Sequence, residues 1–168
     1  MEIETSADID NSEDKQPRKI GGWLFLVALG VIFAPLRLSF ILWTTYLPIL
    51  NDEFWTSIAS ETSDAYIPFF GSLLVGEVII NLIVIVASIY MAILFFQKKS
   101  SFPKWYAFIA IFSTVFILID AYLVTLIMPA IDMFDIDTLK ELSKSLFSCL
   151  VWTPYLFLSL RSKETFIR

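Results

Sequence analysis

The sequence predicts an all-α, polytopic membrane protein: a four transmembrane helix bundle with both termini in the cytoplasm (N-in/C-in). The chain has 168 residues, of which 57% are hydrophobic and 17% are charged, whereas a soluble domain carries about 25% charged residues. Four apolar segments each approach or exceed the roughly 20 residues that a helix needs to cross a bilayer. Basic residues gather at one set of segment ends, which is typical of the cytoplasmic side.

The segments follow one another with short connections. Residues 1–19 are polar and acid-rich, so we expect a disordered acidic cytoplasmic tail. Residues 20–168 form a single four-helix transmembrane domain, with spans at about 20–43, 68–96, 103–128 and 142–160. The first apolar run is longer than the hydrophobic region of a signal peptide, so we expect an uncleaved span. Pro68 and Pro103 open the second and third spans, where a missing N–H is tolerated.

The orientation follows from the placement of lysine and arginine. Basic residues flank the first span, fill the connection between the second and third spans, and follow the fourth span (Lys15, Arg18, Lys19, Lys98, Lys99, Lys104, Arg161, Lys163 and Arg168). The other two connections are acidic and are expected to face outward. In the first of them, "LNDEFWTSIAS" is either a short helix capped by Asn51 or a loop anchored by aromatic residues. In the second, Asp137 is a plausible helix cap.

Three ionisable residues lie within the predicted spans: Arg37, Glu77 and Asp120. With an outer end of the first span at Trp43, Arg37 lies roughly 9 Å deep, and the two acids lie roughly 12–13 Å deep. Such charges face the bundle interior and pair, because an isolated charge in a bilayer is costly. We therefore predict an intramembrane polar cluster in which Arg37 pairs with both carboxylates. Asn81 shares the helix face of Glu77.

The role of this cluster is open between three alternatives. It can be a structural staple that fixes the helix arrangement, a proton- or ion-linked site, or a binding site for a polar head group or a partner helix. Pro35 and Pro154 interrupt their helices, and we expect a kink at each. Small residues spaced four apart, Gly30 with Ala34 and Ser72 with Gly76, predict close helix approach.

Several classes of function are disfavoured by what the sequence lacks. It contains no histidine and one cysteine, which removes histidine-ligated haem, most zinc sites, and nucleophile–histidine catalysis. No cluster of basic charge resembles a nucleic-acid footprint. We therefore expect no catalytic residues, no cofactor, no metal and no nucleic-acid partner, and we predict that the protein is not an enzyme.

The opening "RKIGGWLFLVALGVIFAPLRL", with "IPFFGSLLVGEVIIN", "FPKWY" and the closing "WTPYLFLSLRSKETFIR", resembles a bacterial four-helix inner-membrane family that is known only as a domain of unknown function, the YdgK-like family. The resemblance implies a multi-pass protein of the bacterial inner (cytoplasmic) membrane and implies no mechanism.

The function that we expect first is that of a non-enzymatic accessory or assembly factor, which binds another membrane protein within the lipid bilayer. The alternative is a small proton-coupled transporter or channel that acts as a self-oligomer.

Overall fold

A computed structural model describes residues 16–51 and 53–168, apart from the side chains of Asn51 and Phe54, and all of its regular structure is helical. The predicted tail therefore lies outside the described residues up to residue 15. Three helices are long and apolar enough to cross a membrane: Trp23–Leu50, Phe70–Phe96 and Phe102–Ile127. They correspond to the first three predicted spans.

The first of these helices is longer than predicted. It begins as α1 (Trp23–Ile41), widens into a π-helical turn, η1 (Leu42–Tyr46), and continues as α2 (Leu47–Asn51). The sequence predicts its outer end at Trp43, because tryptophan is enriched at membrane interfaces. The run "LPILN" after Tyr46 remains helical, so the end lies about 10 Å further along the axis than predicted.

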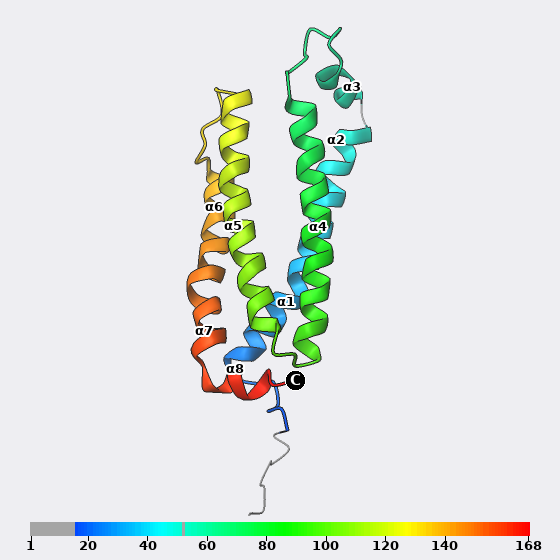
Figure 1. The fold of residues 1–168 in the computed structure, drawn as a ribbon. Coiled ribbons are helices and arrows are strands. Elements are labelled where there is room, and N and C mark those ends of the chain that lie inside the picture. Colours follow the sequence, from blue (N-terminus) through cyan, green and yellow to red (C-terminus); the bar gives the residue numbers. More distant parts are fainter. Residues whose placement is uncertain (1–15, 52) are drawn as a thin grey trace, which may run out of the picture.

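The next elements complete one helical hairpin and begin another. The short helix α3 (Glu53–Ala59) occupies the first acidic connection, so this segment is helical as one alternative predicted, but the predicted cap Asn51 is the last residue of α2 instead. The long helix α4 (Phe70–Phe96) then returns alongside α1, and α5 (Phe102–Ile127) follows after a brief turn. Figure 1 shows α1, α2 and α4 forming one side of the molecule.

The other side pairs α5 with the last long helical run. That run comprises α6 (Ile136–Phe147), the π-helical turn η2 (Ser148–Trp152) and α7 (Thr153–Leu158), all packed on α5 (Figure 1). It begins earlier than the predicted fourth span, and its first turns carry charged residues. Asp135, not Asp137, caps α6, because the Asp135 Oδ1 accepts a 2.8 Å hydrogen bond from the Thr138 backbone N–H.

The tightest packing lies at one end of the molecule, where α8 (Leu160–Thr165) crosses the base (Figure 1). Phe95, Phe102 and Phe166 are at most 5% exposed, with ring centroids 4.7–5.5 Å apart. The rest of this cluster comes from the start of α1, the end of α4 and α7 (Leu24, Val27, Ala28, Val31, Met91, Leu94 and Leu156). We call this the basic end, because the basic segments also meet there.

Three hydrogen-bonded contacts join the segments at the basic end. Arg18 forms an ion pair of 2.6 Å with Glu164, and the Lys98 Nζ donates to the Pro17 carbonyl at 3.2 Å. The Ser100 N–H donates to the Arg168 carbonyl at 2.7 Å. The two described ends of the chain and the α4–α5 connection therefore lie together, as the charge pattern predicted.

The predicted close approach at two glycines is wrong. A Cβ added to Gly30 or to Gly76 would meet no atom within 4 Å, so neither glycine permits a tight helix contact in the described chain. The glycines that do permit one are Gly71, which lies against Trp55 and Ala59 of α3, and Gly21 and Gly22, against which the Arg161 guanidinium packs. The two sequence motifs that lie farthest apart, "IGGWL" and "SLRSKETF", thus meet at the basic end.

Candidate functional site: a polar cleft between the hairpins

A cleft of about 1170 Å³ lies between the two hairpins and is lined by residues of α1, η1, α4, α5, α6 and η2. It is partly open, and apolar side chains make up most of its walls. Between them the cleft carries two polar groups of residues. Pockets for small ligands usually measure about 300–1,000 Å³ and combine apolar walls with a few well-placed polar groups, so this cleft has the composition of a binding site.

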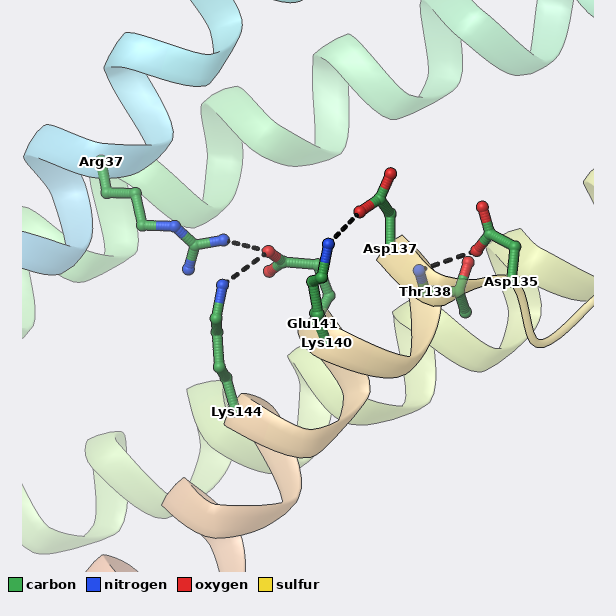
Figure 2. Close-up of polar contacts among 7 residues, drawn as sticks. All are labelled: Arg37, Asp135, Asp137, Thr138, Lys140, Glu141 and Lys144. Atoms are coloured by element: carbon green, nitrogen blue, oxygen red, sulfur yellow. Dashed lines mark hydrogen bonds and ion pairs between the residues drawn. The ribbon is translucent and has the colours of Figure 1, made fainter.

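The first polar group, which we call the basic group, comprises Arg37, Glu141 and Lys144. The Glu141 Oε1 accepts a hydrogen bond from the Arg37 guanidinium and a second, of 3.2 Å, from the Lys144 Nζ (Figure 2). All three residues line the cleft, and each side chain remains 43–59% exposed. One carboxylate thus meets two cations, which leaves one positive charge in excess.

The basic group lies deep along the helices. Hydrogen bonds between hydroxyl groups set the register of α6 on α5: 2.7 Å between Thr114 and Ser145, and 2.8 Å between Tyr106 and Ser148. Thr114 is about 20 Å from the end of α5 at Ile127, close to the midpoint of that helix. Lys144 precedes Ser145 directly, so its charge also lies near the middle of the bundle.

The second polar group, which we call the acidic group, comprises Tyr46, Glu77, Asn81 and Asp120. The Tyr46 hydroxyl donates a 2.9 Å hydrogen bond to the Glu77 Oε2, and the Asn81 amide lies near the same hydroxyl. The Glu77 and Asp120 carboxyl groups are close enough to interact with each other. The Asp120 Oδ1 is buried and receives no hydrogen bond from a donor in the described part of the chain.

The structure therefore separates the predicted cluster into two parts. It brings Glu77, Asn81 and Asp120 together, as predicted, but within the described residues no ion pair joins Arg37 to either acid. The cause is the longer first helix, because Arg37 lies about 20 Å from its end at Leu50, not roughly 9 Å. Glu77 and Asp120 each lie about 10 Å from the corresponding ends of α4 and α5. The prediction that Arg37 is their partner is wrong.

Glu141 was missed in the sequence because it precedes the predicted fourth span. The available signal was the spacing of Glu141 and Lys144, three apart on a helix with leucines on another face. The Glu141 carboxylate accepts hydrogen bonds from both Arg37 and Lys144, and opposite charges this close to a carboxyl group favour its charged form. The carboxylate is therefore held in its charged form beside the two cations.

The charges at the start of α6 outside this group are already paired. Lys140 forms a 2.8 Å ion pair with Asp137 (Figure 2). The hydrogen bond from Thr138 lowers the pKa of Asp135. Lys140 does not line the cleft, so the excess positive charge belongs to the basic group.

The two predicted kink sites lie in helical segments near the cleft. Pro35 lies inside α1, two residues before Arg37. Pro154 stands in the first turn of α7, directly after the π-helical turn η2, which opens the backbone where proline removes a hydrogen bond. π-Helical turns occur often at functional sites, and η1 supplies Tyr46 to the acidic group.

The fold and the cleft define an all-helical protein with membrane-type helices and a polar site between two hairpins. The family model described as "Protein of unknown function (DUF2569)" matches residues 17–167, so the chain belongs to that family. This confirms that the resemblance seen in the sequence was to a family of unknown function. Neither the comparison with curated proteins nor that with solved structures found a match.

Proposed function

We propose that the protein is a small membrane carrier that binds a polar or amphiphilic molecule in the cleft between its hairpins. The observation that carries the proposal is the placement of charged side chains near the middle of the helix Trp23–Leu50 and on α6 level with the midpoint of α5, facing a cavity of about 1170 Å³. Ionisable residues at such depth usually mark the path of a substrate or an ion. This corresponds to the transporter alternative that the sequence left open.

The topology that this function requires is also a proposal. The run from α6 to α7 serves as a fourth span, which tolerates the charges of α6 because they face the cleft and not the lipid. Both termini lie in the cytoplasm, since the basic end carries the lysines and arginines that resist translocation. The membrane is the inner membrane of a bacterium, and the absence of histidine supports a non-enzymatic role without metal or cofactor.

The acidic group supplies a means of proton coupling. A proton held between the Glu77 and Asp120 carboxyl groups would give the Asp120 Oδ1 the hydrogen bond that it lacks. Tyr46 faces the same pair from η1 and donates to Glu77. Loss or gain of that proton changes the attraction between α4 in one hairpin and α5 in the other, and hence the width of the cleft.

The test uses thiol access in reconstituted vesicles, with Cys149 replaced by alanine. Ser113→Cys lines the cleft, whereas Ile111→Cys is a matched control on the same helix that is 55% exposed outside the cleft. A membrane-impermeant thiol reagent should label the cleft position much faster than the control. The same cysteine in an Asp120→Asn background reports how far thiol ionisation alone changes the labelling rate with pH. After this correction, the labelling rate of Ser113→Cys should still depend on pH when Asp120 is present.

Equal labelling of the two cysteines would show that the cleft is closed to water and would remove the proposal. A pH dependence that is the same with and without Asp120 would remove the proton coupling alone.

The accessory or assembly role remains the second candidate, and one observation favours it. Gly30 and Ala34 both line the cleft, and a Cβ added to Gly30 would meet open space. Small residues four apart on a membrane helix usually allow a partner helix to pack closely against it. If a helix of another membrane protein docks there, Gly30→Ile should abolish its recovery in gentle detergent. Gly76→Ile, which also faces open space but outside the cleft, should not affect recovery.

A further inference from the structure

The basic group carries a charge that its own residues do not balance. Arg37 and Lys144 share the single carboxylate of Glu141, and the next acid on α6, Asp137, is held by Lys140. Arg37 has five N–H donors, and Glu141 is its only hydrogen-bond partner in the described part of the chain. Two cations with spare donors thus face a cavity near the middle of the helices, which is where an anion would be drawn.

The cleft around these cations is suited to an anion that carries a hydrocarbon chain. Apolar side chains line the cleft walls on either side of the basic group (Ile80, Val84, Met91, Ile109, Phe116 and Ile117). A small hydrated anion would gain nothing from these walls, whereas an acyl chain would be buried against them. The cavity, at about 1170 Å³, also exceeds the usual range for small ligands.

We propose that the cleft binds one phosphate-bearing amphiphile, with its head group on Arg37 and Lys144 and its chain along the apolar walls. The guanidinium offers two parallel N–H donors to phosphate oxygens, and the lysine adds a point charge. When the site is empty, the Glu141 carboxylate pairs with both cations, so it competes with an incoming phosphate group. This inference rests on the proposed carrier function and names the chemical class of its ligand.

Because Glu141 competes for the two cations, the proposal predicts that one substitution in the site strengthens ligand binding. Removing a cation should weaken binding by about 10- to 100-fold, because a hydrogen bond to a charged group is lost. Removing the competing carboxylate by Glu141→Gln should strengthen binding, because both cations become free for the phosphate. A merely structural role of the ion pair predicts the opposite, since Glu141→Gln would then damage the site as Arg37→Gln does.

The experiment is native mass spectrometry of the full chain, delipidated in detergent and titrated with phosphatidylglycerol. The wild type should retain one lipid molecule, Arg37→Gln and Lys144→Gln should each bind about tenfold more weakly or worse, and Glu141→Gln should bind more tightly. Lys140→Gln, combined with Asp137→Asn so that no acid in the cleft wall loses its partner, is the matched control, since the Lys140 charge lies on the same helix outside the cleft, and it should bind as the wild type does. Lys144→Gln alone suffices if Arg37→Gln does not fold.

Parallel titrations with inorganic phosphate and with diacylglycerol separate the head group from the chain. Both should bind far more weakly than the phospholipid. The proposal is overturned if inorganic phosphate binds as tightly as the lipid, if diacylglycerol does, or if Arg37→Gln, Lys144→Gln and the matched control are indistinguishable. A stoichiometric protein partner or a second copy of the chain in the cleft also overturns it. If Ser113→Cys is accessible while these lipid results fail, the carrier function stands and only the ligand class is wrong.

Discussion

The contact between Gly22 and Arg161 predicts a measurable loss of stability in Gly22→Ala. Gly22 has φ 61° and ψ −139°, a backbone region that residues other than glycine occupy at a cost of about 1–3 kcal/mol. The added Cβ would also lie 3.2 Å from an Arg161 guanidinium nitrogen. Alanine recovers about 0.4–1 kcal/mol by restricting the unfolded chain. The net loss in the free energy of unfolding should therefore be about 1–2 kcal/mol.

The assay is thermal unfolding in mild detergent, followed by circular dichroism. For a chain of this length, 1 kcal/mol corresponds to about 2–4 °C in Tm, so Gly22→Ala should melt about 2–8 °C below the wild type. Gly76→Ala is the control, because it lies inside α4 with open space around its added Cβ. Alanine is the better helix former there by about 1 kcal/mol, so the control should melt at or above the wild type.

The neighbouring glycine refines the same test. A Cβ on Gly21 would lie 2.6 Å from the Arg161 Nη2, but that atom ends a flexible side chain and can move aside. Gly21→Ala should therefore cost less than Gly22→Ala. The reasoning fails if Gly22→Ala melts at or above the wild-type temperature, or if Gly76→Ala is destabilised as much as Gly22→Ala.

Three further outcomes are expected at the basic end and at the start of α6. Phe166→Ala should cost about 3–5 kcal/mol, because its ring is 5% exposed against two other buried rings; a loss under 1 kcal/mol in denaturant unfolding would contradict this. Ser162→Ala should cost about 1 kcal/mol, since its buried hydroxyl donates a 2.7 Å hydrogen bond to a backbone carbonyl of α7, whereas Ser162→Thr should retain the bond. The cap of α6 should be present at neutral pH and lost as the pH falls through the lowered pKa of Asp135, below its ordinary 3.8. The protection factor of the Thr138 amide against hydrogen exchange should then fall, and an unprotected Thr138 amide at neutral pH would refute the cap.

The fold could be predicted largely from hydrophobic run lengths and from charge placement. The runs ending at Phe96 and beginning at Phe102 gave the second and third membrane-type helices almost to the residue, because apolar length is a strong signal there. The first helix could not be bounded in the same way, since Trp43 is the kind of residue that marks a membrane interface. The helix instead continues through a π-helical turn that has no simple sequence signature.

The position of the outer end of the first helix determined which residues of the predicted site were grouped correctly. Glu77 and Asp120 were placed correctly in one group because the ends of α4 and α5 were correct. Arg37 was assigned to them through a depth that was too shallow, and its true partner, Glu141, was taken to lie in a connecting loop. Depth is counted residue by residue from the helix end, so the error of seven residues between Trp43 and Leu50 misplaced Arg37 by about two helical turns and changed its predicted partner.

The two hairpins share the aromatic core at the basic end, so a rotation about this core would displace their opposite ends the most. Each hairpin is about 39 Å long, so a rotation of about 5° about the core moves the opposite ends by about 3 Å. Such a rotation would displace the packed rings of Phe95, Phe102 and Phe166 the least, because they lie at the centre of the rotation. Under the proposed carrier function, such a rotation would let the cleft accommodate molecules of different width without disturbing the aromatic packing at the basic end.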